Sequence, residues 1–594
     1  MTFLDSLAPT ERTIIESYMH PVQFQQGDTI LRQGDPGDGC YLIDQGEVRL
    51  ELEDFETDSD SVLGYILPGM FLGEFSLLDG APRSAFAFAH TDVQARWLSS
   101  AAFDRLCDSE PCLALTLAKA LGRNLSEKLR YYTGRLSEYL FADEADAATN
   151  AMVQQAAAAQ AAFQEWPDER IAALLRDLAY SVAAQAEALA EASARETGMG
   201  CAADKVSKIQ LASLAVLQTL EGQPATGVLN VDQQRLVTEI AAPMGVVLGL
   251  VPVTNPVATI IFKTLVCLKS RNALIYSCHH AALGVGNQTG ALIQAVLERH
   301  AAPPGLVQWL PARTSRRKSM MLMKHHGIAF ILATGGPSLV RAAYSSGTPA
   351  IGVGAGNAPV WVCADADPQA VAGMVVAGKS FDNGMICGSE NNLVVDAAVA
   401  PALSAALEQH GAALLNPDEK LRLLACAFDR EGHLQRSVIG QPAAAIANQA
   451  GVERPYPIRL IVVPAGLDEL GGPLGREKLA PLLSFFTISG VEQGLAVCRR
   501  ILDTEGSGHT AVIHSHDPAL IERFGLAMPA SRIVANVSAS LGIVGGGTGL
   551  QPSMTLGCGT FGGNSTTDNV TYRHLLNVKR LALALERPPA EAGA

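Results

Sequence analysis

The chain has 594 residues, of which 48% are hydrophobic and 17% are charged, and its formal net charge is −15. At roughly 100–200 residues per domain this length predicts about three or four folding units, and the apolar content argues against disorder. The negative charge disfavours a nucleic-acid-binding protein, and the 55 Gly and 31 Pro form no Gly-X-Y repeat, which excludes a collagen-like chain.

Several features of the sequence indicate in which cellular compartment the protein is expected. Eleven cysteines are widely spread with no Cys-x-x-Cys or Cys/His spacing, which predicts neither a metal site nor a disulfide scaffold. The N-terminus lacks a basic stretch followed by an apolar core, so no secretory signal is expected. Residues 241–262 are uncharged, but Pro243, Pro252 and Pro256 interrupt them, which favours a strand and a loop over a membrane-spanning helix. We expect a soluble, cytoplasmic protein with no membrane partner.

Two sequence patterns meet near residue 150, and 141–146 is the best candidate boundary. Residues 20–100 hold short apolar runs separated by turn signals, a pattern typical of a small barrel or jelly roll, and helical spacing follows from 112 to about 140. The Ala-rich stretch 141–195 is predicted to be helical; it could bind a partner, but a helical layer of the next domain is favoured. Beyond residue 240, strand-length runs alternate with helix-length segments, which predicts parallel α/β units.

Residues 73–85 combine groups that suit a phosphate and a sugar. Arg83 supplies a guanidinium, a short helix start supplies backbone N–H groups, and Glu74 could accept a hydrogen bond from a ribose hydroxyl. In isolation, an ordinary β-turn with a surface salt bridge would explain these residues. The whole string, however, resembles the phosphate-binding cassette of the cyclic-nucleotide-binding domain, and the resemblance covers about residues 5–135.

That resemblance implies a role for each of four residues. Arg83 would pair with the cyclic phosphate, Glu74 would take the ribose 2′-hydroxyl, and Gly73 and Ser84 would help to form the phosphate pocket. All four match the family pattern, so a competent site for cyclic AMP or cyclic GMP is expected. No helix-turn-helix follows, so nucleotide binding must control something other than the binding of DNA.

A second group of residues suits nucleophilic chemistry. Cys387 lies in the small-residue loop 381–390, and a cysteine thiolate adds readily to an aldehyde carbonyl. The amide of Asn255 could donate to the resulting oxyanion. Taken alone, a cysteine is more often a core residue, and an asparagine between prolines is more often a turn residue.

From about residue 150 to 587 the chain resembles the aldehyde dehydrogenase superfamily. Its likeness is to the CoA-acylating branch, notably the aldehyde dehydrogenase half of bifunctional aldehyde–alcohol dehydrogenase. The matching segments occur in order at 196–200, 252–256, 262–265, 269–273, 332–337, 343–347, 352–357, 381–390, 477–479, 508–510 and 555–559. The resemblance implies that Cys387 is the nucleophile and that Asn255 completes the oxyanion site with the backbone N–H of Cys387. His509 would serve CoA binding or proton transfer, although a surface-loop histidine fits its spacing equally well.

The same resemblance implies a nicotinamide dinucleotide on the first α/β part, and no metal is expected. Thr334, Gly335 and Gly336 would line the dinucleotide, although a glycine pair alone also fits a simple turn. Glu477 would reach a ribose hydroxyl of the nicotinamide half. The lysine that many aldehyde dehydrogenases use for the adenosine ribose is replaced near Ser277, so NAD is expected and NADP stays open.

One departure from the hydrolytic relatives of this superfamily is informative. Those enzymes carry a glutamate that activates water against the thioester, whereas the aligned position here is Val353, and no Asp or Glu occurs between Thr334 and Cys363. Without that base the CoA thiolate can take the acyl group. The expected reaction is therefore aldehyde + CoA + NAD(P)⁺ to acyl-CoA + NAD(P)H, and its reverse.

The sequence thus predicts a multidomain sensor–enzyme: a β jelly-roll cyclic-nucleotide-binding barrel with flanking helices (1–135), a helical connector (136–155) and an α/β aldehyde dehydrogenase (156–587). The last would contain a Rossmann-like cofactor part (about 156–360), a catalytic part (about 361–560) and a return segment (561–587). We expect a short-chain aldehyde as substrate, acetaldehyde by default, a homo-oligomer, and a separate alcohol dehydrogenase for any further reduction. Two alternatives stay open: a signalling protein with an inactive dehydrogenase half, and an unregulated enzyme with a relic barrel.

Overall fold

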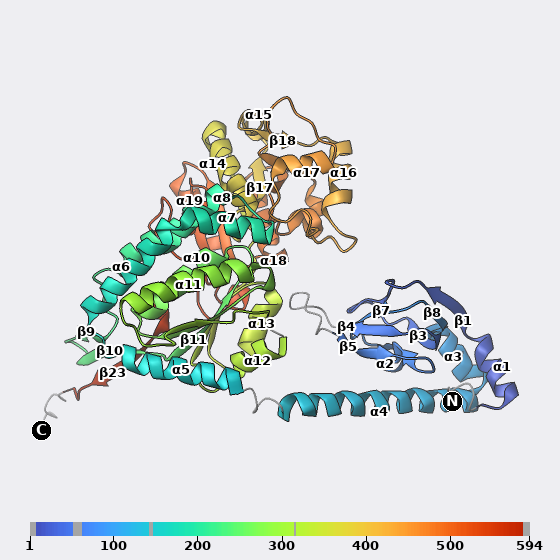
Figure 1. The fold of residues 1–594 in the computed structure, drawn as a ribbon. Helices are drawn as coiled ribbons and strands as arrows, with labels where there is room; N and C mark the ends of the chain where they lie inside the picture. The colour runs from blue at the N-terminus through green and yellow to red at the C-terminus, as the bar shows by residue number, and fades with distance from the viewer. Residues whose placement is uncertain (1–6, 52–61, 142–146, 314–315, 586–594) are drawn as a thin grey trace, which may run out of the picture. The chain divides into compact units, whose positions relative to one another are not determined.

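A computed structural model describes residues 7–51, 62–141, 147–313 and 316–585. The chain divides into two compact units, residues 1–147 with 315–318, and residues 148–314 with 319–594 (Figure 1). Residues 142–146, which fall in the favoured boundary and in the predicted connector, lie outside the described residues, and the predicted domain limits stay predictions. No helix in the described ranges is long and apolar enough to cross a membrane.

The N-terminal unit contains two antiparallel sheets and flanking helices (Figure 1). One sheet has the strand order β1-β8-β3-β6 and the other β2-β7-β4-β5. The elements are α1 (Pro9–Ser17), β1 (His20–Phe24), β2 (Thr29–Leu31), β3 (Gly39–Gln45), β4 (Val48–Glu51), β5 (Val62–Ile66), β6 (Phe71–Leu72), α2 (Glu74–Asp79), β7 (Phe86–Ala89), β8 (Val93–Ser99), α3 (Ser100–Ser109) and α4 (Pro111–Phe141).

Two hydrophobic cores form in this unit because buried side chains lie on both faces of its strands. Successive residues of a strand face opposite sides of the sheet. Leu42 of β3 therefore packs with Leu106 of α3 and Leu117 of α4, whereas its neighbour Ile43 packs with Val48 and other strand residues. The predicted β-rich unit with helices around it is confirmed, and its jelly-roll closure stays a prediction.

The first half of the C-terminal unit is a parallel sheet with the strand order β13-β12-β11-β14-β15. The elements are α5 (Ala147–Phe163), α6 (Asp168–Ala184), α7 (Ala186–Thr197), α8 (Ala202–Gln210), α9 (Val216–Leu220), β11 (Val246–Val251), α10 (Pro256–Lys269), β12 (Ala273–Cys278), α11 (Leu283–Arg299), β13 (Val307–Trp309), α12 (Arg316–Lys324), β14 (Phe330–Thr334), α13 (Pro337–Ser345) and β15 (Ala350–Val353). Helix α6 packs against α10 and α11, so part of the Ala-rich stretch belongs to a helical layer on this sheet. The uncharged stretch 241–262 folds as the end of a strand, the buried strand β11, a loop and the start of α10.

The second half is another parallel sheet, with the order β18-β19-β20-β17-β16-β21-β22. The elements are β16 (Ala358–Val362), α14 (Pro368–Ser380), β17 (Glu390–Asp396), α15 (Ala400–Gln409), β18 (Ala412–Leu414), α16 (Pro417–Ala427), α17 (Ala443–Gln449), β19 (Leu460–Ala465), β20 (Leu482–Ile488), α18 (Val491–Thr504), β21 (Gly508–His514), α19 (Pro518–Ala527), β22 (Ala530–Ala535) and α20 (Ala539–Gly542). An antiparallel sheet of β9 (Gly227–Asp232), β10 (Val237–Pro243) and β23 (Leu576–Ala582) has the order β23-β10-β9. The predicted parallel α/β architecture is confirmed.

Candidate functional site

The candidate active site lies where the carboxyl ends of the first parallel sheet meet the amino ends of the second. The strand order reverses between β11 and β14, and the loops after these two strands carry Asn255 and the pair Gly335 and Gly336. Ligands of open α/β sheets bind at such a reversal, because the loops on either side diverge there. Residues 354–357 then lead from β15 into β16 of the second sheet.

Cys387 follows a tight turn, η6 (Phe381–Gly384), and precedes β17. A Cβ on Gly356 would come within 1.7 Å of the Cys387 carbonyl oxygen, so only glycine lets the two segments pass this closely. Burial, followed by the nearby Glu477 carboxylate, raises the pKa of the Cys387 thiol to about 12. The thiol is therefore protonated at neutral pH and needs a proton acceptor when it reacts.

Asn255 caps the N-terminus of α10 and faces the nucleophile loop. Its Oδ1 accepts a hydrogen bond from Lys208 Nζ at 2.8 Å. Its Nδ2 lies 3.4 Å from the carbonyl oxygen of Met385, two residues before Cys387. The structure thus brings the predicted oxyanion donor to the loop of the predicted nucleophile.

His509 lies at the start of β21 and is fully buried, so the alternative of a surface-loop histidine is wrong. Its Nδ1 shares a 2.8 Å hydrogen bond with the Thr510 hydroxyl, and Nε2 has no hydrogen-bond partner among the described residues. A Cβ on Gly388 would lie 3.2 Å from His509 Cε1, which places the ring beside the residue that follows Cys387. Burial, with Arg532 nearby, lowers the pKa of His509 to about 3, so the imidazole is neutral.

Glu477 joins the same group through the backbone. Its Oε1 accepts the N–H of Gly356 at 3.2 Å, and its own N–H donates to Glu505 at 2.7 Å. Burial and the Glu505 carboxylate raise the pKa of Glu477 to about 8, so the side chain is mostly protonated at neutral pH. A neutral carboxyl can donate one hydrogen bond and accept others, which suits a ribose hydroxyl.

The remaining predicted cofactor residues lie at the end of β14. Thr334 pairs with Val353 of β15, and within the described chain its buried Oγ1 has no hydrogen-bond partner. Gly336 is the N-cap of α13, and a Cβ there would meet nothing within 4 Å. A free hydroxyl beside an open helix N-terminus fits a dinucleotide phosphate or ribose. Ser277 is half-buried at the carboxyl end of β12.

In the N-terminal unit, Arg83 is buried among backbone carbonyls. Its Nη1 donates to the carbonyls of Gly39 and Gly73 at 2.7 and 3.0 Å, and its Nη2 donates to Asp38 Oδ1 at 2.7 Å. Gly73 has a φ of 82°, and a Cβ there would lie 2.5 Å from Arg83 Nη1. Glycine at this position therefore allows the guanidinium to reach its place. Ser84 is exposed next to it.

Glu74 is the buried carboxylate of the same pocket. Its Oε1 accepts from Lys128 Nζ of α4 at 2.6 Å, and Lys128 also donates to the Phe71 carbonyl at 2.5 Å. Its Oε2 is buried and has no hydrogen-bond partner in the described ranges. Burial lowers the pKa of Lys128, while Glu74 acts in the opposite direction. An orphaned carboxylate oxygen beside a guanidinium fits a ligand that carries a hydroxyl and a phosphate.

Sequence reasoning missed the charged residues that hold these side chains. Lys208 and Asp382 support the Cys387 loop, and Asp38 and Lys128 neutralise Arg83 and Glu74. The position of Asp382 inside the matched segment 381–390 could have indicated its role in the site. Lys208 and Lys128 lie in ordinary helical sequence, which gives no indication of theirs.

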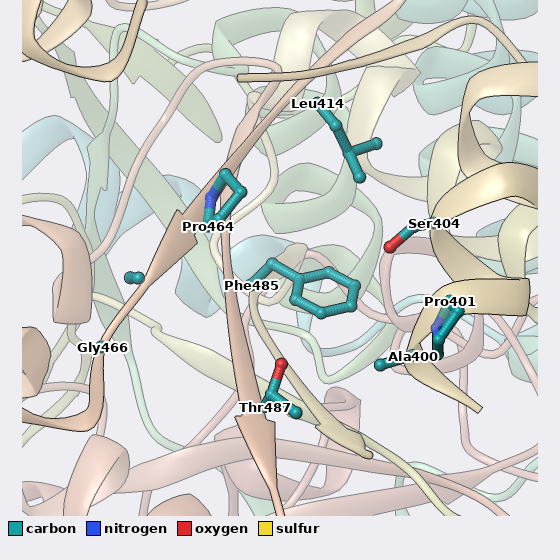
Figure 2. A pocket seen from close by; sticks show the side chains of 9 residues that line it. Ala400, Pro401, Ser404, Leu414, Pro464, Gly466, Phe485 and Thr487 are labelled. Atoms are coloured by element: carbon teal, nitrogen blue, oxygen red, sulfur yellow. The ribbon is translucent and has the colours of Figure 1, made fainter. Parts of the chain in front are cut away.

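A separate open hollow in the second half holds none of these residues. It is lined by α15, β18, β19 and β20, through Ala400, Pro401, Ser404, Leu414, Pro464, Ala465, Gly466, Phe485 and Thr487 (Figure 2). Its lining carries no charged side chain, so it lacks the groups that the predicted chemistry requires.

Comparisons with known proteins identify the family of the chain. Residues 136–421 match the model of the aldehyde dehydrogenase family, and residues 21–110 match that of the cyclic nucleotide-binding domain. The chain is 38% identical over 429 residues to aldehyde-alcohol dehydrogenase 2 of Entamoeba histolytica, covering 70% of this chain and 49% of that protein. It is 35% identical over 463 residues to the acylating sulfoacetaldehyde dehydrogenase of Cupriavidus necator, covering 76% and 92%. The crystal structure of an acetylating aldehyde dehydrogenase from Geobacillus thermoglucosidasius has a TM-score of 0.72 at 36% identity, over 76% of this chain and 99% of that one.

The chain therefore belongs to the aldehyde dehydrogenase family, and the relatives named above include proteins described as acylating or acetylating enzymes. Its N-terminal unit contains a cyclic nucleotide-binding domain at residues 21–110. The chain spans about half the length of the bifunctional relatives that it matches.

The raised pKa of Cys387 predicts slow alkylation by iodoacetamide near neutral pH. Because the thiolate is the nucleophile, its fraction and the alkylation rate should rise about tenfold per pH unit between about pH 7 and 9. Timed alkylation followed by peptide mass spectrometry would measure the rate at Cys387, with the exposed Cys107 as an internal control for the reagent. A rate that has already reached its plateau at pH 7 would contradict the raised pKa.

Proposed function

We propose that this chain oxidises a short-chain aldehyde to its acyl-CoA with NAD⁺ or NADP⁺, reversibly, and that a cyclic nucleotide regulates this activity. The observation that carries the enzymatic part is the convergence of Cys387, Asn255 and His509 at the junction of the two parallel sheets. Acetaldehyde is the default substrate, and sulfoacetaldehyde and propionaldehyde are alternatives. A homo-oligomer and a separate alcohol dehydrogenase belong to the same proposal.

The residues of the site support a sequence of steps. Cys387 adds to the aldehyde carbonyl to form a thiohemiacetal, while Asn255 Nδ2 and the Cys387 N–H donate to the oxyanion. His509 Nε2 is buried and has no partner among the described residues, so it can hydrogen-bond a ligand; because its pKa of about 3 makes it a weak base, we assign it to CoA binding or to a proton transfer that the bound ligands assist. Thr334, Gly335, Gly336 and Glu477 would hold NAD(P)⁺, which would supply a hydride acceptor for the oxidation.

The acyl group is then held on Cys387 as a thioester. At the end of β15, where hydrolytic relatives carry their glutamate, Val353 is a buried side chain without a basic group. Water attack is therefore slow, and the CoA thiolate displaces the acyl group from Cys387.

The regulatory part of the proposal uses the Lys128–Glu74 ion pair. The pair is buried, as is Arg83, and Lys128 belongs to α4, the last described helix before residue 142. A ribose hydroxyl can donate to the free Glu74 Oε2 while Lys128 stays on Oε1, and this sharing of the carboxylate weakens the Glu74–Lys128 pair; a phosphate on Arg83 competes with Asp38. Nucleotide binding would thus loosen the hold of the pocket on α4, and α4 leads along the chain to the dehydrogenase.

Replacing Cys387 with Ser should lower the CoA-dependent formation of NADH or NADPH from acetaldehyde by at least about a thousandfold, because the hydroxyl is a far weaker nucleophile. Cys426→Ser, on α16, is the matched control and should keep the wild-type rate. Without CoA, the wild type should give only a burst of product and then stop. Equal rates for wild type and Cys387→Ser would favour a signalling protein whose dehydrogenase half is inactive.

Calorimetric titration with cyclic AMP and cyclic GMP tests the regulatory part. Arg83→Ala should weaken binding at least about 30-fold, because a buried charge-assisted contact to phosphate is lost, and basal activity should persist. Lys128→Met should still bind the nucleotide but lose the change in dehydrogenase activity. Wild-type protein that binds neither nucleotide would favour an unregulated enzyme with a relic barrel.

A further inference from the structure

A single buried ammonium group joins the oxyanion amide to the nucleophile loop. Lys208 Nζ, on α8, donates to Asn255 Oδ1 at 2.8 Å, to Asp382 Oδ2 at 2.5 Å and to the Met385 carbonyl at 2.8 Å. An ammonium has three N–H donors, so these three acceptors use all of them. The side chain of Lys208 is only 7% exposed, which leaves it little freedom to exchange partners with water.

This contact decides which way the Asn255 amide points. The Lys208 ammonium can only donate, so the oxygen of the amide must face it. Nδ2 lies 3.4 Å from the Met385 carbonyl, which Lys208 also contacts, and this long contact engages one N–H of the amide and leaves the other available to a developing oxyanion. A cation on the amide oxygen also polarises the amide and strengthens its N–H groups as donors.

The second partner of Lys208 fixes the backbone ahead of Cys387. Asp382 and the next residue have φ values of 47° and 52°, which is a strained conformation for residues other than glycine. The Asp382 carboxylate holds this turn by accepting from Lys205, Lys208 and the Cys201 N–H. Lys208 therefore fixes both the donor on α10 and the loop that delivers the sulfur.

We propose that Lys208 is a positioning residue of the oxyanion site, which orients the Asn255 amide toward the carbonyl that Cys387 attacks. This inference rests on the proposed function and adds to it a residue that contacts neither substrate nor cofactor. Loss of Lys208 should slow the step that forms the tetrahedral oxyanion and leave substrate binding nearly unchanged.

Acylation of Cys387 by acetyl-CoA tests the inference without the dinucleotide. The Cys387 sulfur bonds to the thioester carbonyl carbon, the bond from that carbon to the CoA sulfur breaks, and CoA leaves with the proton that Cys387 releases. Intact-protein mass spectrometry follows the gain of one acetyl group at quenched times over a range of acetyl-CoA concentrations. Lys208→Met should lower the maximal rate about 10- to 100-fold, a part of the loss expected for removing an oxyanion donor, and should shift the half-saturating concentration less than about threefold.

A double-mutant comparison separates orientation of the amide from general damage. If Lys208 acts mainly through Asn255, Lys208→Met in an Asn255→Ala background should lose most of its effect, and the loss that remains is the part that comes from its contacts with Asp382 and Met385. Lys205→Met is the matched control, because Lys205 shares Asp382 but contacts the Thr254 carbonyl instead of the Asn255 side chain. Its effect should be smaller and should add to that of Asn255→Ala.

Three results would overturn the inference: a wild-type rate in Lys208→Met, a full additive loss in the double mutant, or an effect confined to the half-saturating concentration. Circular dichroism shows whether Lys208→Met folds. If it does not, Lys208→Gln keeps one donor group, the amide NH₂, and should show an intermediate loss of acylation rate. Most of that loss should also disappear in an Asn255→Ala background. A wild-type protein that is neither acylated by acetyl-CoA nor active with acetaldehyde would overturn the proposed function and this inference with it.

Discussion

The junction of the two parallel sheets depends on buried lysine side chains. A buried backbone carbonyl must be paired, and a lysine nitrogen can pair with carbonyls from more than one segment. Lys263 donates to the carbonyls of Leu250 in β11 and Leu332 in β14, and Lys379 donates to Ser389, Asn391 and the Lys478 carbonyl next to the Cys387 loop. Burial lowers the pKa of both lysines to about 7, and each ties several segments together through one nitrogen.

In the N-terminal unit, buried charged groups must likewise be paired. Arg83 and Glu74 are both buried, and each is neutralised by a residue of the same unit, Asp38 and Lys128. The two pairs differ in exposure, because the side chain of Asp38 is 75% exposed whereas that of Lys128 is 6% exposed. The exposed Asp38 side chain can turn toward water, whereas the buried Lys128 holds both Glu74 and the Phe71 carbonyl against α4. Glu74, and not Arg83, is thus the buried group whose partner belongs to α4.

Local patterns in the sequence were enough to predict the parts of the fold that depend on neighbouring residues. The apolar runs of β11, β12 and β14 predicted parallel strands, whereas the two candidate sites came from the family resemblances carried by the strings around Arg83 and Cys387, and the roles of these residues stay predictions. Lys208 was missed because its acceptors lie 47, 174 and 177 residues away along the chain, and no local pattern encodes such contacts. The burial of His509 could not be predicted from the sequence either, because its exposure depends on how β21 packs and not on its spacing from other residues.

Val353 has a consequence for how such an enzyme would use its substrates. In the proposed reaction, an apolar side chain at the end of β15 would let the free energy released by oxidising the aldehyde be retained in a thioester instead of being lost to hydrolysis. Turnover would then halt whenever free CoA runs short, with the acyl group waiting on Cys387. The rate of aldehyde removal would follow the supply of an acceptor thiol, so one valine would tie the pathway flux to the balance between free and acylated CoA.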